Sequence, residues 1–176
     1  DPNITTGFVN FSTYFINVSH SIPVVSIAAN QLTTLANGNG NLVPFGSFEY
    51  FNMNKQRTTT CYGEFNRHGQ DSWANDQRSI DYVMYDELGY NYALQEQFFN
   101  LTPRDEFQRI ILRAAGDDNY PAAHHTSNTG SAHLRDAYVH NLAKAGNLNL
   151  DVRVGTKAIV YMNGEYWGVY DLREIP

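Results

Sequence analysis

The sequence has 176 residues, enough for one compact domain or for one domain with part of another. A hydrophobic share of 42% argues against disorder and predicts a packed core. The net charge of −6 argues against general nucleic-acid binding, and no apolar run approaches the roughly 18 residues of a membrane span. The single cysteine, Cys61, excludes an internal disulfide and suits a small buried position.

The composition favours a secreted or cell-surface protein, because Asn, Ser, Thr and Tyr are common and Lys is rare. Because the sequence starts at Asp1 without a signal peptide, we expect a segment of a longer protein. Residues 1–20 carry a weak seven-residue repetition and are predicted to be the tail of an upstream β-module or a linker strand; coincidence explains the repetition equally well. Glycosylation is not predicted, since the number of sequons is close to chance, at Asn3, Asn10, Asn17 and Asn100.

The first half of the chain reads as short strands joined by polar loops. Apolar or alternating runs predict strands over residues 22–28, 46–51, 60–68 and 78–85. In the third of these, Tyr62, Glu64, Asn66 and His68 share one face. The Gly/Asn run over residues 37–41 predicts a plain loop, because no Lys follows it as in a phosphate-binding loop.

The loop between the third and fourth strands has the chemistry of an anion site. Gly69 and Ser72 would offer backbone N–H groups and a hydroxyl to an anion. Arg78 begins the next strand, where a cation could neutralise phosphate. An ordinary surface or ion-paired arginine is an equally open interpretation of Arg78.

A buried strand is predicted over residues 107–114, with Ile110 and Leu112 on one face and Arg109, Ile111 and Arg113 on the other. The following loop contains Asp117 and Asp118 and three histidines, His124, His125 and His133. Neighbouring loop histidines have poor geometry for chelating zinc. We therefore predict solvated histidines and no metal site.

One clear helix is predicted over residues 131–145, with Ser131 as N-cap and Gly146 as the stop. Its apolar stripe is expected to pack on the sheet and consists of Leu134, Tyr138, Val139, Leu142 and Ala143. Asp136 is the only carboxylate of this helix, and a plain helix-surface acid is its simplest interpretation.

The last predicted element is a hairpin, with arms over residues 152–162 and 165–172. Asn163-Gly164 lies between two β-branched and aromatic runs, and this is the strongest short-range signal for a type I′ turn. Nearly every position is apolar or aromatic, which predicts a place in the centre of a sheet.

Three blocks carry a resemblance to a known family: HGQDSWANDQRSIDYVMYDELGYNYAL, LRAAGDDN and NGEYWGVYDLRE. In this order they resemble the N-terminal half of CotH-type (spore coat protein H-like) atypical kinase domains. The resemblance implies that residues 21–176 are the N-terminal part of such a domain, ending at a hinge near Glu174. The implied fold is α+β, a mainly antiparallel sheet with one packed helix, like a kinase N-lobe.

The resemblance also implies a function and a site. ATP with Mg or Mn would bind at Gly69, Ser72, Arg78, Asp136 and Glu174, with Arg78 standing where relatives carry Lys and Asp136 as its partner. The family's catalytic and metal-binding aspartates belong to the C-terminal half, which becomes an expected partner, so no catalytic residue is assigned here. The implied activity is protein phosphorylation by the complete domain. The alternative is a catalytically inactive, pseudokinase-like module for surface adhesion or assembly.

Overall fold

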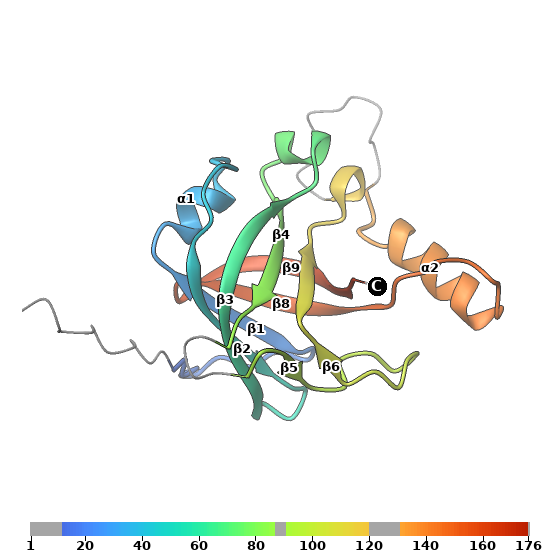
Figure 1. The fold of residues 1–176 in the computed structure, drawn as a ribbon, viewed down its shortest axis with the longest axis horizontal. Helices are drawn as coiled ribbons and strands as arrows, with labels where there is room; N and C mark the ends of the chain where they lie inside the picture. Colours follow the sequence, from blue (N-terminus) through green and yellow to red (C-terminus); the bar gives the residue numbers. More distant parts are fainter. Residues whose placement is uncertain (1–11, 87–90, 120–130, 176) are drawn as a thin grey trace, which may run out of the picture.

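The computed structural model describes residues 12–86, 91–119 and 131–175. Within these residues seven strands form one closed barrel, in the order β1-β2-β3-β4-β7-β9-β8 (Figure 1). The barrel strands are β1 (Val24–Ala29), β2 (Phe45–Phe51), β3 (Arg57–His68), β4 (Ser79–Met84), β7 (Arg109–Arg113), β8 (Gly155–Met162) and β9 (Glu165–Glu174). The other elements are α1 (Leu32–Ala36), η1 (Asp71–Ala74), β5 (Leu94–Gln95), β6 (Glu106–Phe107), η2 (Gly116–Asp118) and α2 (Arg135–Ala145).

One parallel pairing closes the barrel. All other neighbouring strands are antiparallel, but β1 runs parallel to β8, with Val24 opposite Ile159 and Ile27 opposite Met162. The amide of Ile159 donates to the carbonyl of Pro23 at 2.9 Å. Closure of this kind satisfies the backbone groups that an edge strand would leave unpaired.

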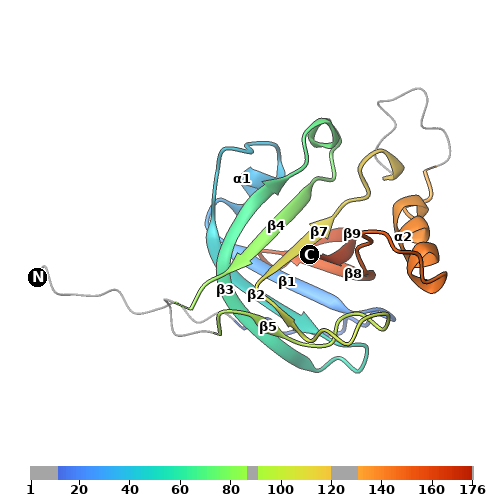
Figure 2. The same ribbon diagram turned by 45° about the vertical axis from the view of Figure 1, so that its right-hand side comes forward.

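The expectation of an α+β, kinase N-lobe-like fold with one packed helix is wrong. The sheet is mixed rather than purely antiparallel, because β1 pairs in parallel with β8. This pairing joins two strands far apart in the sequence and closes the sheet into a barrel. The helix α2 lies outside the barrel, beside the ends of β8 and β9 (Figures 1 and 2). Of its predicted apolar stripe only Ala143 is buried, so the stripe does not pack on the sheet.

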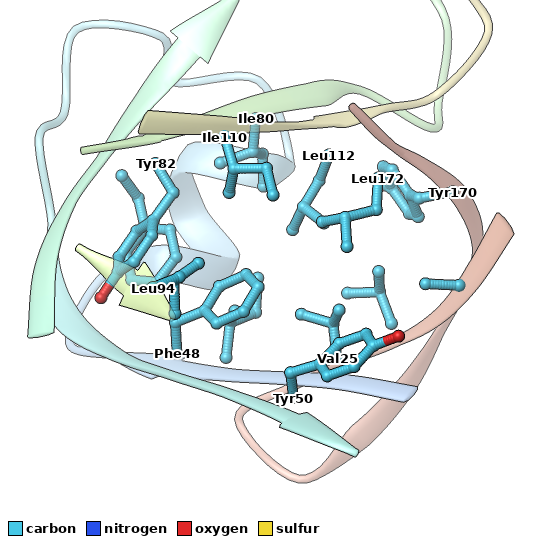
Figure 3. Packing of buried hydrophobic residues seen from close by; sticks show 14 of the residues in the cluster. Val25, Phe48, Tyr50, Ile80, Tyr82, Leu94, Ile110, Leu112, Tyr170 and Leu172 are labelled. Carbon is cyan, nitrogen blue, oxygen red and sulfur yellow. The ribbon is translucent and has the colours of Figure 1, made fainter. Parts of the chain in front are cut away.

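The inside of the barrel is filled by alternate side chains of its strands. Side chains from opposite walls, among them Phe48, Tyr82, Leu112 and Leu172, point toward one another (Figure 3). The aromatic rings of Phe48 and Tyr82 stack with centroids 5.2 Å apart. The inward side of β7 carries Ile110 and Leu112, as the alternation predicted. The interior is therefore a packed core, dominated by dispersion and the burial of apolar surface.

The small β5–β6 sheet contributes to the same core. Leu94 and Phe107 are opposite each other in this sheet and are both fully buried. Phe98 meets Tyr50 of β2 edge to face, with centroids 4.7 Å apart. Residues 91–99 thus contain a short strand and two buried phenylalanines, Phe98 and Phe99.

One segment before β1 covers part of the outer face of the barrel. Residues 12–22 lie over β1 and β2, where Thr13 donates to the buried carboxylate of Glu49 through its amide and its hydroxyl. Phe15 packs edge to face on Phe51 and Tyr161. The division into residues 1–20 and 21–176 stays a prediction, although residues 12–20 contain no strand.

The hairpin prediction is confirmed, with Asn163 at φ 51° and Gly164 at φ 85° in the turn between β8 and β9. The predicted helix exists but begins later, at Arg135 rather than Ser131. His133, predicted to be solvated, is buried. Other predictions lie outside the described residues: the part of the residue 1–20 repetition that falls in residues 1–11, the sequons at Asn3 and Asn10, and the pair His124 and His125.

Candidate functional site

Arg78 is a structural clamp in this fold. Its guanidinium donates Nε–H to the carbonyl of Trp73 at 2.9 Å and Nη1–H to the carbonyl of Ala36 at 3.1 Å. It also lies over the Trp73 ring, 5.9 Å from the ring centroid. These contacts tie the β3–β4 loop to the end of α1. Arg78 forms no ion pair with Asp136, so the pairing expected from the resemblance is wrong.

The Gly69–Ser72 turn lies next to this clamp and is closed by its own neighbours. Gly69 has φ 99°, and a Cβ at this position would meet the Ser72 hydroxyl at 2.6 Å, so the turn depends on glycine. Arg67 donates to the carbonyls of Gly69 and Gln70, and the Trp73 indole donates to His68 at 2.8 Å. The structure thus brings Gly69, Ser72 and Arg78 together around Trp73, as a packed loop.

Asp136 lies in a different cluster, between α2 and the outer face of the barrel. Its Oδ2 accepts from Nε of Arg113 at 2.9 Å and lies 2.5 Å from Nη1 of Arg173. We call these three residues the Arg113–Asp136–Arg173 cluster. Burial alone would raise the pKa of Asp136, but the two guanidinium groups hold it below its ordinary value. The carboxylate therefore stays ionised and fixes both arginines.

Strand register explains why the two arginines meet this carboxylate. Arg113 of β7 is opposite Asp171 of β9, and Asp171 is opposite Lys157 of β8. Arg173 is two positions beyond Asp171 on the same strand, so it emerges on the same outer face. Lys157 lies 2.7 Å from the Asp171 carboxylate. A row of cation, carboxylate and cation thus crosses three strands under α2.

One donor in this cluster has no protein partner. The side chain of Arg173 is only 6% exposed, yet its buried Nε–H lacks an acceptor. An unpaired buried donor costs about 1–3 kcal/mol. Arg113 is 27% exposed and remains open to solvent. An anion that reached this cluster would therefore find one exposed guanidinium and one unsatisfied buried donor.

Glu174, the expected hinge residue, joins β9 to its surroundings. Its Oε1 accepts from the amide of Val154 at 3.0 Å, and its Oε2 lies 3.8 Å from Nη1 of Arg104. It follows Arg173 directly in β9, so it belongs to the same strand end as the Arg113–Asp136–Arg173 cluster. Through these two contacts Glu174 holds the end of β9 against Val154, which directly precedes β8, and near Arg104.

The sequence-based search missed Arg113 and Arg173, although a signal was present. Both lie at outward positions of strands whose inward positions are apolar, and a charge on such a face requires a partner. The search followed the motif position of Arg78 instead. Arg78 already donates to three backbone carbonyls, whereas the buried Nε–H of Arg173 has no acceptor.

Over residues 12–86, 91–119 and 131–175, no three His, Cys, Asp or Glu side chains gather where they could hold a metal ion. None of the helices in these ranges is both long and apolar enough to cross a membrane.

No protein-family model matches the chain, and no curated protein matches it.

Proposed function

We propose that the chain binds the phosphates of a nucleotide for a secreted or surface phosphotransferase of the CotH type. The observation that carries this proposal is the ion pair between a strand cation, Arg113, and a helix carboxylate, Asp136. Protein kinases use a cation on a strand, held by a carboxylate on a helix, to position the phosphates of ATP. The resemblance of the three sequence blocks gives independent support.

The proposed roles follow from the contacts of each residue. Arg113 and Arg173 contact phosphate oxygens, because one is partly exposed and the other has a free Nε–H donor. Asp136 orients both guanidinium groups and keeps their separation fixed. ATP would supply the phosphoryl group. The catalytic and metal-binding aspartates are assigned by the resemblance to the C-terminal half of the family's domain, which remains the proposed partner.

Calorimetry with ATP and Mg²⁺ or Mn²⁺ tests this proposal. We expect saturable binding that falls at least tenfold in Arg113→Ala and is partly retained in Arg113→Lys. Arg78→Ala is the matched comparison, because the Arg78 guanidinium donates to backbone carbonyls and lies over Trp73, away from the Arg113–Asp136–Arg173 cluster. Thermal unfolding of each variant separates lost binding from lost folding. Absent binding, or binding that depends on Arg78 and not on Arg113, would overturn the proposal.

A catalytically inactive surface or assembly module is the second candidate. The observation that favours it is the exposed apolar side of α2, which includes Tyr138 and Leu142. Contiguous exposed apolar surface marks interaction sites in soluble proteins. A chain that fails to bind ATP in the calorimetric test, yet folds normally, would leave this second function as the better one.

A further inference from the structure

Residues 12–22 cross the outer face of the barrel without forming a helix or a strand, and we call this segment the strap. Near its start, Thr13 donates to the buried carboxylate of Glu49 through its amide and its hydroxyl. Near its end, Nε2 of His20 lies 2.9 Å from the hydroxyl of Tyr161 in β8. Polar contacts at both ends therefore fix the strap on the barrel.

The surface of the barrel beneath the strap is apolar. Val24 of β1 and Phe51 of β2 are opposite each other in register, and both side chains are buried. Phe15 of the strap meets the Phe51 ring edge to face, with centroids 5.2 Å apart, and Ile22 packs against the same apolar cluster. The strap thus shields apolar surface that would otherwise contact water.

A pocket of about 240 Å³ lies between the strap and this surface. Six of its ten lining residues have apolar or aromatic side chains: Tyr14, Phe15, Val18, Ile22, Val24 and Phe51. An apolar cavity of about 150 Å³ holds benzene, so this pocket has room for an aromatic ring with a short chain, roughly ten non-hydrogen atoms. Burial of apolar surface against these walls favours an apolar ligand.

Lys55 brings a positive charge to the rim of the pocket. It is an exposed lining residue in the turn between β2 and β3. Asn52 fixes this turn, because its Oδ1 accepts from the amides of Asn54 at 2.9 Å and Gln56 at 3.1 Å. In the part of the chain that the structure describes, the Lys55 ammonium has no ion-pair partner. It is therefore available to an anionic ligand.

The lining of the pocket contains no acid that would compete for this ammonium. None of the ten lining residues is Asp or Glu. The carboxylate of Glu49, which holds the strap, already accepts from Thr13 and lies 2.7 Å from Nη1 of Arg57. One cation beside apolar walls matches one carboxylate, because a phosphate with nearly two charges would lose more hydration than a single ammonium replaces.

We propose that this pocket binds a small apolar carboxylic acid. Its hydrocarbon part would lie between the strap and the Val24–Phe51 pair, and its carboxylate would face the Lys55 ammonium. None of the lining residues belongs to the Arg113–Asp136–Arg173 cluster, so the inference goes beyond nucleotide binding and does not depend on it.

The test compares phenylpropionate with two ligands of the same shape, phenylpropanol and phenylpropylamine, in NMR titrations of the labelled chain. Phenylpropionate should give saturable shifts in the strap and in the β2–β3 turn. The neutral alcohol should bind roughly fivefold more weakly, because it lacks the charge that pairs with Lys55, and the amine should bind more weakly still. Higher salt should weaken binding of the acid alone.

Three variants locate the site. Lys55→Gln should lower the affinity for phenylpropionate to that of the alcohol, and Lys144→Gln, at an exposed lysine in the last turn of α2, should leave it unchanged. Val18→Trp should fill the pocket and remove binding of all three ligands. Thermal unfolding of each variant separates a lost site from a lost fold.

Two sets of results would overturn the inference. Equal affinity for the acid and the alcohol, or full binding of the acid by Lys55→Gln, would make a neutral apolar molecule the occupant. No saturable shifts at millimolar phenylpropionate, or shifts that Val18→Trp leaves unchanged, would show that the pocket takes no such ligand. These titrations contain no nucleotide, so their failure is distinct from failure of ATP binding.

Discussion

At the scale of single residues, Asn163 connects three segments of the chain. Its backbone adopts the left-handed conformation that the β8–β9 turn requires. Its Oδ1 accepts from the amide of Ala29 at the end of β1, and its Nδ2 donates to the hydroxyl of Thr33 in α1. One side chain thus fixes both the turn and the β1–α1 connection next to it.

Asn163→Ala should lower the free energy of unfolding by about 2 kcal/mol or more, because alanine is strained at positive φ and two hydrogen bonds are lost. Asn163→Gly keeps the conformation and loses only the hydrogen bonds, so it should cost about half as much. Urea unfolding of both variants measures this difference. Equal losses would show that conformation at this position contributes nothing.

Cys61 should be inert in the folded chain. Its side chain is fully buried in the barrel, its Sγ lies 3.1 Å from the carbonyl of Asn91, and burial raises the pKa of its thiol to about 11. We expect no reaction with an aromatic disulfide reagent at pH 8 and one equivalent after unfolding in guanidinium. Rapid labelling of the native chain would contradict the closed barrel around this residue.

At the scale of elements, α2 is attached mainly through carboxylates. Asp118 accepts from the amides of Ala132, Leu134 and Arg135, so it caps the helix from outside it. Burial opposes ionisation of Asp118, but these amides and Arg135 keep its pKa below the ordinary value. Asp136, whose pKa is also lowered, attaches the first turn to the barrel. The position of the helix therefore depends on ionised carboxylates.

Acid should loosen α2 before it unfolds the barrel. A carboxylate whose pKa is lower in the folded chain than in the unfolded chain stabilises the fold. This contribution is complete above the pKa of the unfolded chain, about 3.9 for Asp, and it is lost as the pH falls through the pKa of the folded chain. Amide exchange measured by NMR should rise in α2 below about pH 4 while β8 and β9 stay protected. Asp136→Asn should show faster exchange in α2 already at pH 6. If the amides of α2, β8 and β9 lost protection at the same pH, the attachment of α2 through ionised carboxylates would be contradicted.

At the scale of the whole molecule, the inward side chains of neighbouring strands pack together inside the closed barrel. Leu112 of β7 and Leu172 of β9 are opposite each other in register, both fully buried and both pointing inward (Figure 3). Both residues belong to the one large apolar cluster inside the barrel. This pair therefore reports on the packing of the closed structure.

Leu112→Ala and Leu172→Ala should each cost about 2–5 kcal/mol in the free energy of unfolding, from lost burial and the cavity left behind. The double variant should lose less than the two single losses together, because the second deletion enlarges a cavity already present. Chemical denaturation of the three variants completes this double-mutant cycle. Strict additivity would show that the two side chains do not contact each other.

The local elements could be predicted from the sequence, and their long-range arrangement could not. The alternation in β3 and β7 and the Asn163-Gly164 turn correctly placed individual side chains because these signals act over a few residues. The β1–β8 pairing joins strands far apart in sequence, and nothing in either strand specifies that partner. The fold class was therefore wrong although most of its strands were correctly located.

In the candidate site too, contacts within one loop could be predicted and contacts between distant segments could not. Gly69, Ser72 and Arg78 are close together, as expected from one loop, but the partner of Asp136 depends on the register of β7 and β9. A helix with an apolar stripe normally packs through it, and this expectation failed for α2. Partly buried ion pairs from Asp136 to Arg113 and Arg173 hold its inner side instead. This charge pattern is visible only once Arg113 and Arg173 share a face of the barrel.

The parallel contact between β1 and β8 has a consequence for how the chain folds. β2 follows β1 closely along the chain, but the second neighbour of β1 is β8, which is made only after all the strands from β2 to β7. Until then its backbone donors and acceptors on that side face water or a wrong partner, and joining the ends of so long a loop is slow. We expect the nascent chain to hold an open sheet with an unpaired edge until the β8–β9 hairpin is made, so chaperone assistance should be most useful just before synthesis reaches residue 162.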